Sequence, residues 1–137
     1  MGDSTVMEFD IETLVSGSVT HGAMASFRER TPAGAGPPLH RHRDQIEVFH
    51  VIRGRYRFLL EGDSIDAGPG DCITVPAGAT HAFRNLLDET SELHFSLLPA
   101  GESEAFFQRL VAGDFDPDDI EAFFSRHGID LLGPPMG

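Results

Sequence analysis

Short runs in which hydrophobic and polar residues alternate dominate the first hundred residues of the chain. Alternation of this kind places every second side chain on the same face of a strand. The segments expected to form strands are 6–17, 19–30, 47–52, 56–60, 72–75, 80–84 and 92–98. Gly, Pro and Asp residues separate these runs at intervals of roughly eight to twelve residues, a spacing typical of a β-sandwich or barrel. The pattern therefore predicts an all-β core rather than a βαβ fold.

The hydrophobic period changes after Pro99. Apolar residues recur at helical spacing over 106–111, and Gly113 follows where a C-terminal cap is expected. Asp116 and Pro117 form a good helix start, with an N-cap acid and a proline in the first turn. A second helix is predicted from there to Gly128. We expect both helices to cover one face of the β core, and the tail 131–135 to dock onto the protein.

Composition narrows the classes of partner. The chain has 137 residues, a formal net charge of −12 and one cysteine. Such an acidic chain is repelled by nucleic-acid phosphates and anionic lipid, so neither nucleic acid nor membrane is an expected partner. Cys72 cannot form an intramolecular disulfide, and its apolar neighbours predict a buried strand residue. Residues 1–10 lack the apolar segment of a signal peptide, and a cytoplasmic location is predicted.

Three histidines and one glutamate stand at fixed offsets from turn residues. His40 and His42 are two residues apart, so an extended backbone points both to the same face. Glu47 opens the next strand and can supply a carboxylate oxygen, whereas His81 must arrive from another strand. Imidazole nitrogen and carboxylate oxygen bind divalent transition metals such as Fe, Ni, Mn, Cu, Co or Zn. Three nitrogens and one oxygen would leave coordination positions open for chemistry.

Two segments carry a family resemblance. They read Gly34-x5-His40-x-His42-x4-Glu47-x6-Gly54 and Gly70-x5-Pro76-x-Gly78-x2-His81-x3-Asn85. This pair resembles both conserved motifs of the cupin superfamily, complete at every defining position. The helical end and tail resemble a quercetinase-like subset of small single-domain cupins, although this second likeness is less specific.

The resemblance implies a fold, a metal site and an assembly. The fold would be a double-stranded β-helix, or jelly-roll barrel, with two short C-terminal helices. One domain would span 1–137, with a barrel over about 6–99 and a helical extension over 100–137. His40, His42, Glu47 and His81 would hold one divalent transition metal, and the protein would be a homodimer that binds a small molecule.

Strand parity extends the candidate site beyond the four ligands. Phe49 and Val51 share parity with Glu47, and Phe83 shares it with His81, so these side chains should point inward as core or as pocket wall. His94 belongs to a polar row that either faces solvent or lines the cavity, and we include it among the pocket candidates. His50 is out of phase and should face away, whereas Asn85 is expected to pin a turn.

The function expected from this site is a metal-dependent dioxygenase acting on a small enolisable or aromatic substrate. In that interpretation Glu47 is both a metal ligand and the general base that takes the enol proton. Two alternatives stay open: a non-oxidative metal-dependent isomerase or lyase, and a cupin that binds a small ligand without turnover.

Overall fold

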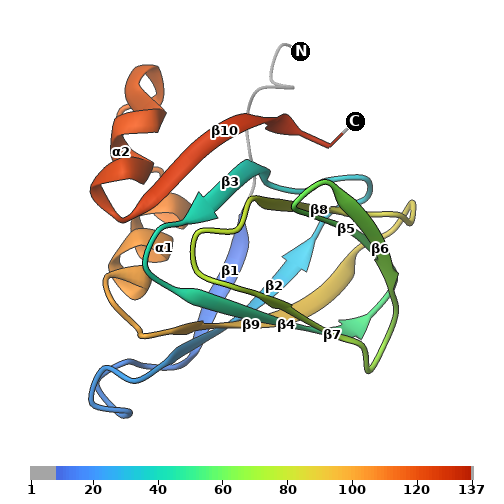
Figure 1. Ribbon diagram of the computed structural model, residues 1–137, viewed down its shortest axis with the longest axis horizontal. Helices are drawn as coiled ribbons and strands as arrows, with labels where there is room; N and C mark the ends of the chain where they lie inside the picture. The colour runs from blue at the N-terminus through green and yellow to red at the C-terminus, as the bar shows by residue number, and fades with distance from the viewer. Residues whose placement is uncertain (1–8, 137) are drawn as a thin grey trace.

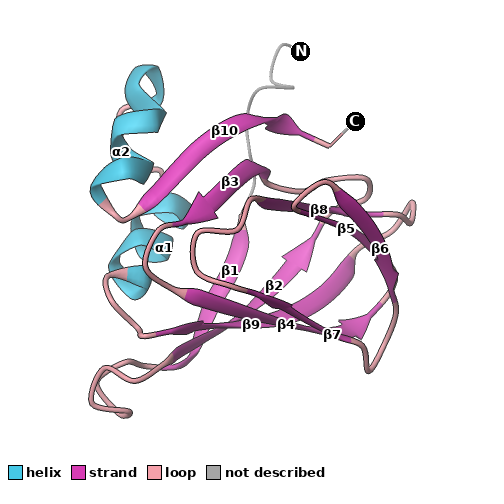
Figure 2. Cartoon of the chain, in the orientation of Figure 1, coloured by secondary structure: helices cyan, strands magenta, loops and turns pink. Residues whose placement is uncertain are grey.

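The computed structural model describes residues 9–136, which form two antiparallel five-stranded sheets and two short helices (Figures 1 and 2). The elements are β1 (Asp10–Val15), β2 (Ala25–Thr31), β3 (Pro38–His42), β4 (Ile46–Arg53), β5 (Tyr56–Leu60), β6 (Asp63–Ala67), β7 (Cys72–Val75), β8 (His81–Asn85), β9 (Ser91–Leu98), α1 (Ser103–Ala112), the 3-10 turn η2 (Pro117–Asp119), α2 (Ile120–Arg126) and β10 (Ile129–Pro135). The strand orders are β1-β2-β9-β4-β7 in one sheet and β10-β3-β8-β5-β6 in the other.

This arrangement confirms the predicted double-stranded β-helix, although the sheets do not close into a barrel. In the described part of the chain, the outer strands β1 and β10 belong to different sheets and do not pair with each other. The helices occupy this side instead, because α1 packs beside β1 and α2 beside β10 (Figure 1). The helices therefore fill the space between two sheet edges rather than covering the outer face of one sheet.

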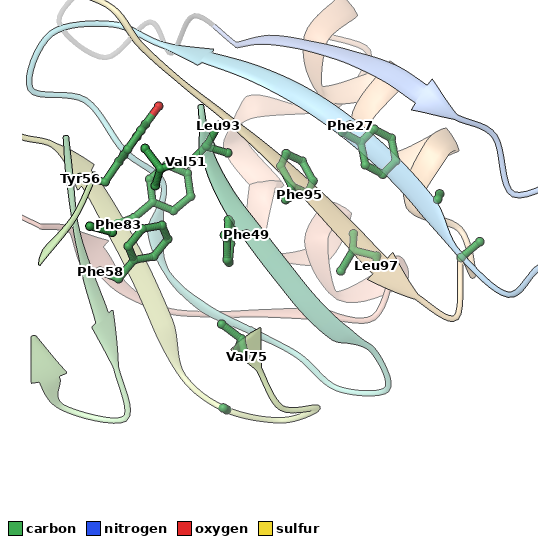
Figure 3. Packing of buried hydrophobic residues seen from close by; sticks show 14 residues of the cluster. Phe27, Phe49, Val51, Tyr56, Phe58, Val75, Phe83, Leu93, Phe95 and Leu97 are labelled. Carbon is green, nitrogen blue, oxygen red and sulfur yellow. The ribbon is translucent and has the colours of Figure 1, made fainter. Parts of the chain in front are cut away.

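The core between the sheets is built from aromatic side chains on the inward rows of the strands. Phe49 of β4 lies between Phe95 of its own sheet and the Phe58 and Phe83 pair of the opposite sheet (Figure 3). The ring centroids of Phe49 are 5.1 Å from Phe58, 5.5 Å from Phe83 and 6.0 Å from Phe95. These edge and tilted contacts suit aromatic quadrupoles and bury large apolar areas.

A second hydrophobic cluster joins the helices to β10. Its buried members are Phe106, Leu110, Phe123, Phe124 and Ile129. The helix ends match the sequence signals, since Gly113 has a φ of 69° at the C-cap of α1 and the Asp116 side chain accepts a hydrogen bond from the Asp118 amide. Phe107 contacts both clusters and so links the helices to the sheets.

Four features differ from the sequence-based expectations. The strand predicted over 19–30 begins only at Ala25, because residues 17–23 form turns in which His21 has a φ of 55°. The segments that form β6 and β10 were not predicted as strands, and β3 begins at Pro38, where a loop was expected to end. Residues 6–8 of the first predicted strand lie outside the described residues.

The prediction that Cys72 is buried is wrong. The cysteine is exposed, and it pairs in register with the exposed His50 of β4. Successive strand residues point to opposite faces, and it is Val75, three positions later, that enters the core. The outward orientation of His50 agrees with its predicted phase.

Local contacts explain Gly36, which lies within the first motif segment, and Asn85, which ends the second. A Cβ on Gly36 would lie 1.8 Å from the Phe83 carbonyl oxygen, so only glycine allows this loop to approach β8. Asn85 is fully buried and donates to the Thr31, Pro32 and Glu89 carbonyls, while its Oδ1 accepts from the Leu87 amide. Asn85 therefore pins the adjoining turns, as predicted.

No helix in the part of the chain described here is long and apolar enough to cross a membrane.

Candidate metal centre and cavity

Three strands from two sheets bring the four predicted ligands together. His40 and His42 occupy alternate positions of β3 and both point inward, and His40 pairs in register with His81 at the start of β8. Glu47 enters from β4 in the opposite sheet. One ligand atom from each residue lies within 4.8 Å of the others. The exposed fractions are 9% for His40, 4% for His42 and Glu47, and 1% for His81.

Backbone carbonyls orient two of the imidazole rings. His40 Nδ1 lies 2.7 Å from the Pro38 carbonyl oxygen, and His81 Nδ1 lies 3.0 Å from that of Ala79. In each case a ring N–H can donate to the carbonyl two residues earlier, which leaves Nε2 directed at the cluster. Such contacts outside the ligand shell fix the tautomer and the ring orientation of a metal-binding histidine. The Gly78 amide also donates to the His42 carbonyl, which holds the loop before β8 against β3.

The Glu47 carboxylate links two of the three rings, those of His42 and His81. Its Oε1 lies 2.9 Å from His81 Nε2 and 3.1 Å from His42 Nε2. Burial alone would raise the pKa of Glu47, but the charges and hydrogen bonds of His42 and His81 hold it far below its ordinary value. Glu47 is therefore an anion at neutral pH.

The histidines respond to this environment in different ways. Burial, together with the neighbouring His81 and His42, lowers the pKa of His40 to about 3, so its ring is neutral. Burial would also lower the pKa of His81, but the hydrogen bond and charge of Glu47 outweigh burial and raise it. In the metal-free protein His81 thus tends to keep a proton at the nitrogen that faces Glu47.

The donor set fits a divalent transition metal. Three imidazoles and one ionised carboxylate offer nitrogen and oxygen ligands of the type that Zn, Fe, Ni and related ions prefer. His42 Nδ1 is a buried nitrogen with no hydrogen-bond partner among residues 9–136, so protein contacts alone leave this ring incompletely satisfied. The cluster is compact, buried and anionic at one atom, as a cation site requires.

A cavity of about 510 Å³ opens from the cluster towards the helices. His40, His42 and Glu47 form one part of its wall, and most of the rest is apolar. The remaining wall includes Phe49, Phe83 and Phe95 from the core, Phe106, Phe107 and Phe124 from the helices, and Pro37 and Pro38 from the loop and start of β3. A volume of this size accommodates a small aromatic molecule.

The structure separates the predicted pocket residues into two groups. Phe49 and Phe83 line the cavity, whereas Val51 is 2% exposed within the core and is not part of the wall. The prediction that His94 lines the cavity is wrong. Its side chain is 36% exposed on the outer face of β9, 3.6 Å from Glu92, because the inward positions of this strand are taken by Leu93 and Phe95.

Glu29 is a cavity residue that the sequence analysis missed. It lies on β2 with the inward parity of Ala25 and Phe27, and it lines the same cavity as the histidines. Parity with Phe27 was the available signal. The charge of Glu29, between Arg28 and Arg30, is more typical of a position that faces solvent.

Comparison with known proteins identifies the class of protein that this fold and cluster define. The model of the Cupin domain family matches residues 27–97, a segment that contains all four clustered residues. The chain belongs to the cupin family.

Individual relatives carry different activities. The chain is 30% identical over 91 residues to the quercetin 2,3-dioxygenase of Bacillus subtilis (strain 168), which covers 66% of this chain and 26% of that protein. It is 26% identical over 116 residues to polyketide synthase CurC of Streptomyces cyaneus, covering 83% and 75% of the two chains. The chain thus spans about a quarter of the length of the dioxygenase.

Solved structures confirm the fold. A predicted oxalate decarboxylase from Thermotoga maritima superimposes with a TM-score of 0.64 at 21% identity, covering 66% of this chain and 80% of that one. At this identity the similarity establishes the architecture and carries no information on the substrate.

Proposed function

We propose that this cupin is a metal-dependent dioxygenase that acts on a small, uncharged, enolisable aromatic substrate. The observation that supports the proposal best is the combination of a buried His/His/Glu/His cluster with an aromatic cavity that opens directly from it. A bound redox-active ion would supply a place where an enolate and dioxygen come together.

The chain's own residues have separate roles in this proposal. His40, His42, His81 and Glu47 hold the ion, and the carbonyls of Pro38 and Ala79 keep two of the rings aimed at it. Glu47 also takes the enol proton from the substrate, since its carboxylate is ionised and lies at the cavity wall. Phe49 and Phe83 contact the aromatic ring and exclude water.

The cavity favours an uncharged ligand over a dicarboxylate. Arg30 is the only cationic side chain among the described residues that line it, and its guanidinium is already within 3.6 Å of Asp10 and 3.8 Å of Glu92. Apart from the metal ion itself, an oxalate-like dianion would therefore find Glu29 and Glu47 in the wall and no unpaired arginine among the described lining residues. Quercetin and polyketides, the compounds in the names of two relatives, carry hydroxyl and carbonyl groups that can enolise.

Metal content and oxygen uptake test this proposal together. Glu47→Gln and His81→Ala should each weaken metal binding at least about tenfold, because each removes a ligand rather than a supporting contact. His50→Ala is the matched control, since this exposed histidine lies on the same strand as Glu47 and points away from the cluster.

The readouts are elemental analysis of protein purified without added metal and oxygen consumption with flavonol, catechol and diketone substrates. Full metal content in both ligand variants would contradict the proposed site. Bound metal without oxygen uptake on any substrate would contradict the dioxygenase. Product formation without oxygen, in protein that holds zinc, would instead support the isomerase or lyase alternative.

We also propose that the protein is a cytoplasmic homodimer. Ile46 and Ile52 are 43% and 44% exposed on the outer face of β4, which gives an apolar surface to a second copy. Light scattering tests the dimer directly, and a monomeric mass would exclude it.

A further inference from the structure

Glu29 gives the cavity a second carboxylate, at a different level from the metal cluster. In the sheet register Glu29 pairs with Leu93, which pairs with Val51 on β4. Glu47 instead pairs with Leu97, four positions further along β9. The row formed by Phe27, Phe95 and Phe49 lies between these two levels. The cavity thus has the histidine cluster at one level, the Glu29 carboxylate at another and aromatic rings in between.

Two buried hydroxyl groups hold the Glu29 carboxylate. Thr31 Oγ1 donates to Glu29 Oε2 at 2.8 Å, and the Tyr56 hydroxyl donates to Thr31 Oγ1 at 2.9 Å. Tyr56 and Thr31 are 0% and 2% exposed, so this chain of donors starts inside the core, where Tyr56 packs against Phe58 and Phe83 (Figure 3). Both hydroxyl protons point towards the carboxylate. Within residues 9–136, Glu29 Oε1 accepts no hydrogen bond, so it is available to a ligand.

Within residues 9–136, Glu29 forms no ion pair that would compensate its charge. Burial, with added repulsion from Glu47 and Asp10, raises the pKa of Glu29 to about 7. The neighbouring arginines alternate with Glu29 along β2, and their guanidinium groups are engaged elsewhere, Arg28 with Glu12 and Arg30 with Asp10 and Glu92. A partly buried carboxylate of this kind is costly unless donors meet both of its oxygens. A hydroxyl group of a ligand in the cavity can supply that donor.

We propose that Glu29, supported by Thr31 and Tyr56, is a second polar subsite that accepts a hydrogen bond from a hydroxyl group of the ligand. The inference rests on the proposed function in that it takes the same cavity as the substrate site. It specifies the ligand further, as an uncharged aromatic compound with a hydroxyl group remote from its metal-binding end. Carboxylated analogues are disfavoured at this subsite by repulsion from Glu29.

Three probes of nearly equal shape test the subsite without any need for turnover. They are 1-naphthol, 1-methoxynaphthalene and 1-naphthoate, with binding to the protein as purified followed by probe fluorescence. At pH 8, where the Glu29 carboxylate is mostly ionised, the wild-type protein should bind naphthol about tenfold more tightly than the methyl ether, the difference expected for one hydrogen bond to a charged acceptor. In Glu29→Gln this preference should fall to about threefold or less, and naphthoate should bind more tightly than to the wild type.

Two further variants make the result specific. Glu12→Gln makes the same change of charge on the outer surface of β1 and should leave all three affinities unaltered. Tyr56→Phe removes the hydroxyl that donates to Thr31 but keeps the Glu29 carboxylate, so this variant should retain part of the naphthol preference. Thermal melting checks that each variant is folded.

Equal binding of naphthol and its methyl ether by the wild type would overturn the subsite, as would a preference that survives Glu29→Gln. Failure of all three probes to bind would overturn it as well. None of these outcomes involves oxygen uptake or metal content, so they are distinguishable from failure of the proposed dioxygenase.

Discussion

At the scale of single residues, the cluster is defined by which nitrogen carries a proton. His40 is neutral because burial and its imidazole neighbours lower its pKa, whereas Glu47 favours the protonated form of His81. A metal ion needs the same His81 nitrogen that faces Glu47. Metal and proton therefore compete for one atom, and this competition sets the pH dependence of the site.

Metal affinity should accordingly weaken as the pH falls. Because the pKa of His81 is raised above 6.5, binding between pH 5.5 and 6.5 must displace about one proton per ion. The dissociation constant should rise about tenfold for each unit by which the pH falls in this range. Above the pKa of His81 it should no longer depend on pH. Titration calorimetry in two buffers of different ionisation enthalpy measures the released proton. An affinity independent of pH in this range would contradict the competition.

A second prediction at the residue scale concerns how the stability contributed by Glu29 depends on pH. The sign of this dependence is opposite to that of a salt-bridged carboxylate. Its pKa rises from 4.5 to about 7 on folding, so between these values the unfolded chain holds fewer protons than the folded one. Stability contributed by this group therefore falls as the pH rises from 4.5 to 7. Glu29→Gln should raise the free energy of unfolding at pH 8 by up to about 3 kcal/mol and change it little at pH 4.5.

Urea titrations at both pH values, with matched metal content, test that difference. Glu12→Gln again supplies the control on the surface. Equal effects at the two pH values would show that Glu29 is not desolvated by the cavity.

At the scale of elements, the sequence predicted the strands that show local alternation of polar and apolar residues. It missed a strand that is extended only because it pairs with a neighbour. The alternation of His40 and His42 predicted that both share a face, and the resemblance to the cupin motifs implied the full cluster with Glu47 and His81. The strand β10 could not be predicted in this way. Its Gly133, Pro134 and Pro135 interrupt any alternation, and it is extended because it pairs with β3. His94 was misassigned because parity defines two faces but does not say which face is inside.

The strand β10 completes the support of the metal cluster. It pairs Leu131 with His40 and Ile129 with His42, so it covers the outer edge of the strand that carries two ligands. Asp130 binds Arg41 of β3 at 2.8 Å and also contacts Arg43. These hydrogen bonds hold the pKa of Asp130 below its ordinary value. The tail expected only to dock is thus part of the sheet.

Removing the Asp130 charge should therefore affect the metal site from a distance. Asp130→Asn is expected to cost less than about 1 kcal/mol of global stability, as for other exposed ion pairs. It should nevertheless speed hydrogen exchange in β3 and weaken metal binding severalfold, because the ligand-bearing strand is held less firmly. Asp66→Asn is the control, since it breaks a comparable pair with Arg57 at the far edge of the same sheet. Equal effects of the two variants would contradict the role of β10.

At the scale of the whole molecule, two hydrophobic clusters meet at one side chain. The sheets enclose the first cluster, and the helices with β10 enclose the second. Phe107 of α1 lies with its ring centroid 4.9 Å from that of Phe27, 5.2 Å from Phe95 and 5.0 Å from Phe106. The cavity lies along this junction, with walls supplied by both clusters. Its shape therefore depends on the helices staying attached to the sheets.

Phe107→Ala should loosen that attachment. Truncation of a buried phenylalanine costs about 3–5 kcal/mol, and we expect the lower end here because Phe107 is only partly buried. Loss of the shared ring should also let the helices unfold before the sheets, so that far-ultraviolet circular dichroism of the helices and fluorescence of Tyr56 report different urea midpoints. Val111→Ala, at a position 45% exposed on the same helix, should leave one transition and lose far less stability. Coincident midpoints in Phe107→Ala would mean that the two clusters are coupled through other contacts, among which the pairing of β10 with β3 is the strongest that the fold provides.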